Sequence, residues 1–306
     1  MNIAVNTPEW LAARQKNIGG SEVAGLFGLS KYTTSFKLYH QKRGSIDPDV
    51  LDNDRVLAGQ ILEPAIANLA MAKFEINLRR VHRYIPHPTV RGMAASLDYE
   101  TVSAPRIPAE IKNVDFRVFR DEWEIDGNTI TVCPPHIQLQ LVHQMACTGA
   151  KEALIFVLVA GNTLYHGRFP FRADIAEKIE RRITHFWADV AAEREPAIEG
   201  GDDLGVLQDL YRVSDPATTV DLSGDNEAID AAHRLAAAKT IGAEARREER
   251  SAKTVLLEKL QGASAATLPG FELTMSDIKG ARVEAFDRKP YRKMNFKKLP
   301  EKEGAA

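Results

Sequence analysis

Two charged motifs lie inside segments whose apolar pattern predicts β-strands, and any fold of this chain has to accommodate both. Asp98 lies within a predicted strand from Gly92 to Tyr99, and Glu110 and Lys112 flank Ile111 in a second one. Side chains alternate along a strand, so Glu110 and Lys112 point to the same face. An antiparallel neighbour carrying Asp98 would bring two carboxylates and one ammonium group together.

This combination of groups suits metal-assisted hydrolysis. Carboxylates and a backbone carbonyl are hard oxygen ligands that Mg²⁺ or Mn²⁺ prefers. A lysine beside them can orient or deprotonate a water. The alternative is a solvated strand edge, with Asp98 capping a turn, because a Glu-x-Lys triplet is common. The twelve residues from Asp98 to Glu110, with proline-bounded strands between them, favour the site.

The first two hundred residues alternate helical and strand patterns. Short helices are predicted at 8–16, 21–27 (with Ser21 as N-cap) and 35–42, and a longer one begins at Asp52 or Asp54. Pro64 lies inside the long helix and should bend it near Glu63. Its predicted apolar face consists of Leu57, Ile61, Leu62, Ala65, Ile66 and Leu69.

The strand segments are short and are joined by recognisable turns. They are predicted at 81–85, 92–99, 107–114 and 130–132, and a hairpin joins 153–159 to 163–169 through Gly161-Asn162. Helices follow at about 135–147 and 175–190. This order predicts an α/β fold with a mixed central sheet flanked by helices.

The last hundred residues have a different character. Gly200-Gly201 marks a predicted boundary between a domain at 1–200 and an extension at 201–306. Residues 201–230 hold eight acidic side chains and one basic, whereas 279–302 hold nine basic and three acidic. Between them we expect a charged helix at 226–260 and a hairpin formed by 271–275 with 283–285. The role of this extension is not readable from its residues.

The composition excludes several classes of protein. With 44% hydrophobic and 27% charged residues the 306-residue chain is expected to fold, and its net charge of −2 does not by itself indicate a nucleic-acid binder. Two cysteines, Cys133 and Cys147, cannot supply a four-cysteine metal site. No apolar run is long enough for a membrane span. A soluble cytoplasmic protein is expected.

Four motifs in order resemble a known group of nucleases. Asp-x(n)-Glu-x-Lys between strands is similar to the core of the PD-(D/E)xK nuclease superfamily, whose fold is restriction-endonuclease-like. The further motifs are similar to the YqaJ viral recombinase group, which is related to the phage lambda exonuclease. They are the segment from Arg14 to Glu22, Gly59-Gln-Ile-Leu-Glu63-Pro64, and Pro135-His-Ile-Gln138-Leu-Gln140-Leu-Val-His-Gln144-Met. The resemblance covers about residues 9–190.

The resemblance implies a metal-dependent catalytic site. Asp98 and Glu110 match the metal-binding carboxylates, and the carbonyl of Ile111 matches a further ligand. Lys112 matches the lysine that activates water. The remaining matches are Glu63, a helical glutamate that completes the metal site, and Gln138, a glutamine near the metal. The implied cofactor is Mg²⁺ or Mn²⁺.

The resemblance also implies contacts to DNA. Arg14 and Ser21 match a pair that holds the 5′-phosphate, although a plain N-cap with a surface arginine is the simpler explanation of these two residues alone. A guanidinium offers a bidentate fork to phosphate, and backbone N–H groups at a helix start add donors. We expect Lys31, Tyr32 and Gln140 to line the DNA path.

The resemblance therefore implies a phosphodiester hydrolase of a bacterial or phage-infected cell. Its expected activity is 5′-to-3′ exonuclease digestion of linear double-stranded DNA, which leaves 3′ single strands for phage-type recombination. The family implies a ring-shaped homo-oligomer, often a trimer, and a single-strand annealing partner. One alternative is a Mg²⁺-dependent endonuclease, nicking or structure-specific, on the same fold. Another is a non-catalytic DNA-binding assembly protein, which the intact motif disfavours.

Overall fold

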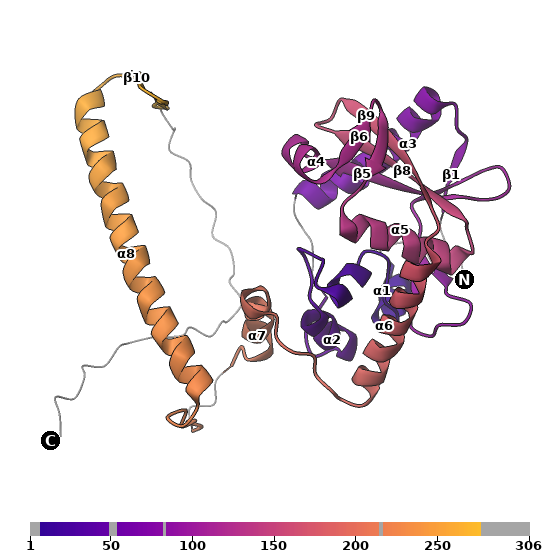
Figure 1. The fold of residues 1–306 in the computed structure, drawn as a ribbon, viewed down its shortest axis with the longest axis horizontal. Coiled ribbons are helices and arrows are strands. Elements are labelled where there is room, and N and C mark those ends of the chain that lie inside the picture. The colour runs from indigo at the N-terminus through magenta and orange to yellow at the C-terminus, as the bar shows by residue number, and fades with distance from the viewer. Residues whose placement is uncertain (1–6, 49–53, 82–83, 214–216, 277–306) are drawn as a thin grey trace. The chain divides into compact units, whose positions relative to one another are not determined.

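The chain folds into two compact units. The structure is a computed structural model that describes residues 7–48, 54–81, 84–213 and 217–276. The first unit ends at Leu210 and the second begins at Tyr211. The first contains a mixed sheet with its helices, and the second a long helix and a hairpin (Figure 1).

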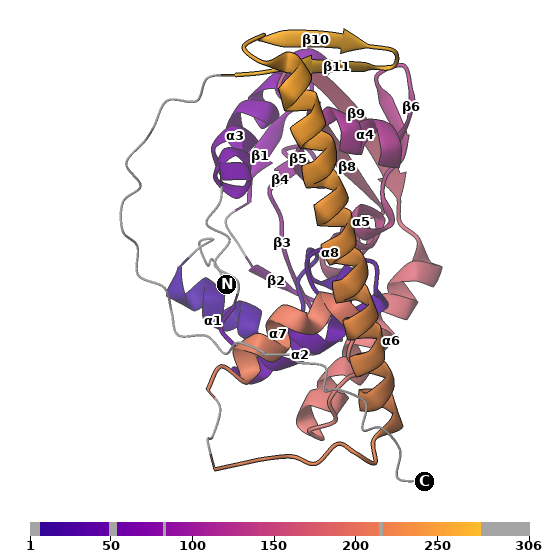
Figure 2. The same cartoon turned by 90° about the vertical axis from the view of Figure 1, so that its left-hand side faces the viewer.

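The first unit is built on a seven-stranded sheet in the order β1-β4-β5-β8-β9-β7-β6. Figure 2 shows β1, β4, β5 and β8 following one another in this order. β5 pairs in parallel with β8 and β7 with β9, and the other neighbours are antiparallel. The mixed α/β fold expected from the sequence is confirmed. The strands are β1 (Leu78–Arg80), β4 (Tyr99–Thr101), β5 (Pro108–Val114), β6 (Glu124–Asp126), β7 (Thr129–Val132), β8 (Glu152–Val159) and β9 (Thr163–Pro170).

The central strand β8 explains why the sheet has a core on both faces. Its alternate residues Leu154, Phe156 and Leu158 lie in one hydrophobic cluster, and the intervening residues lie in the other. A strand buried on both faces has a continuous apolar sequence instead of an alternating one. α3 (Asp54–Phe74) packs on the first face, and α5 (Pro135–Thr148) and α6 (Ala173–Ala191) belong to the second.

Two helical predictions were wrong in detail. The segment expected as a helix from Ser21 is a 3₁₀-helix at Val23–Phe27, and Glu22 precedes it without a side-chain cap. Ser21 is therefore not an N-cap. The apolar face of α3 is also rotated, because the buried residues are Ile66, Ala67 and Ala70. Three of the predicted core residues, Leu57, Ile61 and Leu69, are exposed.

The predicted strands before β5 are shorter than expected. In place of 81–85 and 92–99 the chain forms β1, β2 (Tyr84–Pro86), β3 (Ala94–Ser96) and β4. β2 and β3 form a two-stranded sheet of their own. Asp98 consequently lies in a bend between β3 and β4, and not on a strand. The other helices of the first unit are α1 (Pro8–Gln15), α2 (Ser35–Arg43) and α4 (Phe116–Glu122).

The end of the first unit packs against α2. After the 3₁₀-helix Gly200–Asp203, α7 (Leu204–Leu210) places Val206 in a small cluster with Phe36 and Ile46. The buried side chain of Asp203 accepts a hydrogen bond from Thr34 at 2.5 Å. Residues 201–210 therefore pack with the first unit, although the sequence suggested a boundary at Gly200-Gly201.

The second unit contains α8 (Asn226–Leu260) and a hairpin of β10 (Ala265–Leu268) with β11 (Phe271–Thr274). Asp225 caps α8 by accepting from the N–H groups of Glu227 and Ala228. The strand at Phe271 was expected to pair with 283–285, but it pairs with β10, and 283–285 lie outside the described residues. Among the described helices none has the length and apolarity needed to cross a membrane.

Candidate active site

The site is built around Glu110 on β5. Ala109 and Ile111 enter the core beneath α3, so the alternation of the strand turns Glu110 toward α5 on the opposite face. Two amides of α5 donate to its buried carboxylate. Gln140 Nε2 lies 2.6 Å from Oε1, and Gln144 Nε2 lies 2.6 Å from Oε2. Glu110, only 2% exposed, is thus fixed in position by both oxygens.

Asp98 joins this site from the bend before β4. Its Oδ2 accepts a hydrogen bond of 3.0 Å from the backbone N–H of Ile111. Burial raises the pKa of Asp98 well above its usual range, and the neighbouring charge of Glu110 raises it further. The N–H and C=O of one residue in a strand point to the same edge, so the carbonyl of Ile111 also faces the edge where Asp98 lies.

Lys112 supplies the positive charge of the site. Its Nζ lies 2.5 Å from Oε1 of Glu110, as the shared face of the two residues predicted. Burial alone would lower the pKa of Lys112, but Glu110 and Asp98 outweigh burial and the pKa is raised. The ammonium is therefore protonated at neutral pH and acts as a hydrogen-bond donor in this state.

Glu63 lies on the sheet-facing side of α3, one turn before Ile66 and Ala67. Burial raises its pKa, Arg80 opposes this, and Glu110 adds to it. Arg80 of β1 is its ion-pair partner, with Nη2 at 3.3 Å from Oε1. Glu63 is thus electrostatically coupled to the site, while its carboxylate is held by an arginine.

The donor set fits a divalent cation with few protein ligands. Within the described ranges no three His, Cys, Asp or Glu residues are grouped closely enough to hold a metal ion. Mg²⁺ usually keeps several waters and binds through one or two carboxylates together with substrate phosphates. Asp98, Glu110 and the carbonyl of Ile111 match that requirement. Burial opposes the charge of Asp98 more than Lys112 favours it, and a cation bound beside the carboxylate would favour that charge.

The glutamines of α5 have different partners. Gln138 was expected beside the metal, but its Nε2 donates to the backbone carbonyl of Cys133 at 2.6 Å, at the start of α5. Gln144 does contact Glu110 and was not among the predicted site residues. Gln140 and Gln144 are four residues apart, so they lie on one face of the helix. This spacing was the sequence signal for a role of Gln144 in the site.

Arg14 of α1 is ion-paired with Glu22, the residue that follows Ser21. Arg14 Nη2 lies 2.9 Å from Oε1 of Glu22, and Ser21 is exposed in the turn before it. Gly20 lies against α5, because a Cβ there would be 3.2 Å from Cγ of Gln140. The turn that carries Ser21 and Glu22, to which Arg14 is bound, therefore begins against the helix that holds Glu110.

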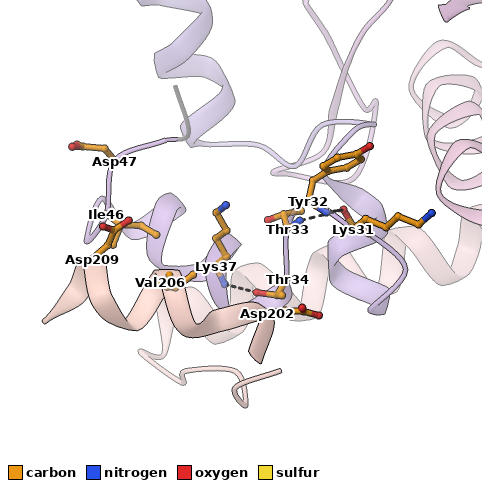
Figure 3. A pocket seen from close by; sticks show the side chains of 12 residues that line it. Lys31, Tyr32, Thr33, Thr34, Lys37, Ile46, Asp47, Asp202, Val206 and Asp209 are labelled. Atoms are coloured by element: carbon orange, nitrogen blue, oxygen red, sulfur yellow. Dashed lines mark hydrogen bonds between the residues drawn. The ribbon is translucent and has the colours of Figure 1, made fainter. Parts of the chain in front are cut away.

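Lys31 and Tyr32 lie beside a pocket, and the DNA contact expected of them stays a prediction. Lys31 is ion-paired with Glu122 of α4, and Tyr32 is 73% exposed. Both line a pocket of about 210 Å³ between α2 and α7. Figure 3 shows Lys37 in this pocket between Tyr32 and Asp47. Three aspartates line it as well, Asp47, Asp202 and Asp209, and they would repel phosphate.

The comparison with known families agrees with these motifs. Residues 9–151 match the family described as the YqaJ-like viral recombinase domain. This segment contains Glu63, Asp98, Glu110 and Lys112, together with the amides of α5. The predicted resemblance is confirmed for this part of the chain.

Two known proteins are similar to the chain beyond this domain. The uncharacterized protein YqaJ of Bacillus subtilis (strain 168) is 25% identical over 229 residues, which are 74% of this chain and 70% of that protein. The crystal structure of an alkaline exonuclease from Laribacter hongkongensis matches with a TM-score of 0.50 at 22% identity. The matched region covers 62% of this chain and 95% of the exonuclease. At that identity the likeness is one of fold.

Proposed function

We propose that this YqaJ-like protein is a DNA nuclease that requires Mg²⁺ or Mn²⁺. The observation that carries the proposal is the arrangement of Asp98, Glu110 and Lys112 at one edge of β5, with Glu110 held by two amides. Two acidic side chains with a lysine suit the hydrolysis of a phosphodiester. The fold shared with an alkaline exonuclease supports the same reaction class.

Each residue has a distinct role in this proposal. Asp98, Glu110 and the carbonyl of Ile111 hold the cation, and Glu63 adds negative charge from α3. The bound cation supplies charge stabilisation for the phosphate and acidifies a water. Lys112 orients the water that attacks phosphorus. Gln140 and Gln144 hold the carboxylate of Glu110 in place, because each donates an N–H to one of its oxygens.

We further propose that digestion starts at a 5′ end of linear duplex DNA and proceeds 5′ to 3′. Arg14 and Ser21 would hold the terminal phosphate, beside the helix that supports Glu110. Water attack with loss of the 3′-oxygen leaves a 5′-phosphate on the shortened strand, so each cleavage recreates the end that Arg14 holds. The product, a 3′ single strand, suits an annealing protein, and a homo-oligomeric ring would keep the enzyme on DNA.

The test compares linear duplex with covalently closed circular DNA, each with Mg²⁺ and with EDTA. The expected result is release of mononucleotides from the linear duplex alone, and only with Mg²⁺. Glu110→Gln should reduce the rate by at least about 100-fold, since it removes a ligand charge. Glu124→Gln is the matched control, because Glu124 is an exposed carboxylate of β6 in the same sheet.

The outcomes separate the parts of this proposal. Cleavage of closed circles would replace the exonuclease with an endonuclease. Equal rates with EDTA would contradict the metal requirement. Undiminished activity in Glu110→Gln would show that this site does not perform the reaction.

A further inference from the structure

Glu22 is the centre of a partly buried charged network between α1 and α2. Its carboxylate accepts from Arg14 Nη2 at 2.9 Å and from the backbone N–H of Gly19 at 2.8 Å. Lys42 Nζ of α2 lies 3.0 and 2.9 Å from its two oxygens. Only 13% of the Glu22 side chain is exposed. One carboxylate thus joins a helix end, a glycine loop and a second helix.

Lys42 uses all its hydrogen-bond donors within this network and has none free for a ligand. Its side chain is 4% exposed. An ammonium has three N–H donors. All three have acceptors here, the two oxygens of Glu22 and the backbone carbonyl of Arg14 at 2.8 Å. A lysine buried in this way cannot reach a DNA phosphate, and its role is to fix Glu22 and the end of α1.

Arg14 is held on one side and open on the other. Nη2 of Arg14 donates to Glu22, and the guanidinium of Arg14 lies over the ring of Trp10, 4.7 Å from its centroid. No acceptor for Nε or Nη1 is found among the described residues, and about a third of the side chain is exposed. The guanidinium is therefore oriented before any ligand arrives, with donors still available for an anion.

The same network connects this arginine to both acidic residues of the candidate active site. Gly20, which precedes the Ser21-Glu22 turn, lies against Gln140, and Gln140 donates to Glu110. On the other side Trp10 Nε1 donates to Ser96 at 3.2 Å, two residues before Asp98. A shift of the arginine would change its distance from the reacting phosphate.

We infer that Glu22 and Lys42 are positioning residues, which hold Arg14 so that its remaining donors grip a terminal 5′-phosphate at a fixed distance from Glu110. This inference rests on the proposed grip of Arg14. Buried ion pairs often add little net stability compared with apolar side chains of similar volume, whereas they fix geometry. Preorganised donors bind an anion without the loss of side-chain freedom that a mobile arginine suffers.

The experiment measures binding of two duplexes in EDTA by fluorescence anisotropy. They differ only in a 5′-phosphate or a 5′-hydroxyl, and a hairpin closes the other end. We expect wild type to prefer the phosphate at least about tenfold, since charge-assisted bidentate pairs are the strong hydrogen bonds. Glu22→Gln and Lys42→Met should each reduce this ratio below about threefold and leave 5′-hydroxyl affinity within about twofold. The double variant should be no worse than either single one, because the two residues act as a unit.

Lys16→Met is the matched control. Lys16 is an exposed cation two residues from Arg14, and its loss should weaken binding of both duplexes equally and leave the ratio unchanged. Glu22→Asp is the milder variant, should the others fail to fold. It keeps the charge, but its shorter side chain cannot reach Arg14 and Gly19 together, so the ratio should fall.

The binding ratios test the grip of Arg14 and the positioning role of Glu22 and Lys42 separately. A wild-type ratio near one contradicts the grip of Arg14 on a 5′-phosphate, and so contradicts the proposed starting point of digestion. A high wild-type ratio that folded Glu22 or Lys42 variants retain contradicts the positioning role alone. Circular dichroism and thermal unfolding establish that each variant is folded.

Discussion

At the scale of single residues, the two carboxylates of the candidate site are held in different ways. The carboxylate of Glu110 has three hydrogen-bond partners, the amides of Gln140 and Gln144 and the ammonium of Lys112. Asp98 accepts a hydrogen bond from the N–H of Ile111, which favours its ionised form, as does the charge of Lys112. Burial and Glu110 together raise its pKa. Burial and Glu110 thus outweigh the groups that favour the charge of Asp98, and a cation beside the carboxylate would favour its ionised form.

Asp98→Asn tests this statement. The amide can still accept from Ile111 but carries no charge, so the metal-free variant should unfold at a higher temperature than wild type at pH 8. Each kcal/mol gained corresponds to about 2–4 °C for a domain of this size. Single-turnover cleavage should fall at least about 100-fold. Thermal melts with and without Mg²⁺ complete the test: a Mg²⁺-dependent shift as large as that of wild type would contradict the role of Asp98 as a ligand.

His143 gives the protein a dependence on pH. It is fully buried, burial lowers its pKa to about 4, and its Nε2 lies 3.2 Å from the carbonyl of Ile18. Between pH 6.5 and 4 the unfolded chain binds a proton that the folded chain does not. Stability is therefore complete above pH 6.5 and falls as the pH drops toward 4. The loss attributable to His143 is about 3 kcal/mol.

Denaturant unfolding of wild type and His143→Gln from pH 7 to pH 4 checks this expectation. Glutamine can still donate to Ile18 but does not titrate in this range. The curve of the variant should be flatter by about 3 kcal/mol over the interval. Parallel curves would mean that other groups cause the acid sensitivity.

Much of the site was predictable from sequence, and the misses share a cause. The alternation of Glu110 and Lys112 gave the correct common face, because a strand period is local. The prediction that Ser21 caps a helix was wrong. The neighbouring Glu22 forms ion pairs with Arg14 and Lys42, and the local sequence pattern does not show these contacts. The apolar face of α3 was wrong because apolar residues lie on more than one side of that helix, and only packing selects the buried ones.

At the scale of elements, glycine turns determine how closely the helices approach. Gly92 has φ +80°, and its carbonyl accepts from Trp187 Nε1 of α6 and from the N–H of Ile18. A Cβ at Gly92 would lie 2.2 Å from Nε1 of Trp187. Such a contact cannot exist, so α6 and the loop at Ile18 can meet only over a residue without a side chain. The sequence alone shows the glycine but not its distant neighbour.

Gly92→Ala should therefore destabilise the first unit by roughly 2–4 kcal/mol, which combines the left-handed backbone with overpacking. Gly127→Ala is the control. It also has a positive φ, +57°, but nothing lies within 4 Å of its added Cβ. That variant should lose only about 1–2 kcal/mol. Equal losses in chemical denaturation would show that the contact with Trp187 is relaxed easily.

At the scale of the whole molecule, the first unit contains both the candidate site and the hydrophobic clusters. Every residue of the candidate site, and every residue of the three hydrophobic clusters, lies before Tyr211. In the described part of the second unit the long helix α8 is exposed along nearly all its length. We expect the first unit to fold and to cleave DNA without the second.

The fragment 1–210 should keep the melting temperature and the Mg²⁺-dependent activity of the first unit. The fragment 1–200 is the informative comparison. It lacks Val206, which packs on Phe36 and Ile46, and Asp203, which binds Thr34. Loss of a buried valine and a buried hydrogen bond should lower stability by about 2–4 kcal/mol. Equal melting temperatures of the two fragments would place the functional boundary at residue 200.

The parallel pairing of β5 with β8 has a consequence for the order of assembly during synthesis. Glu110 is translated early, but its strand partner begins at Glu152 and its amide partners lie at 140 and 144. Parallel neighbours close a long loop, and such distant contacts form late. A nascent chain that stops on the ribosome before β8 therefore carries its acidic residues in water, unassembled. Incomplete translation products should leave the DNA of the cell uncut.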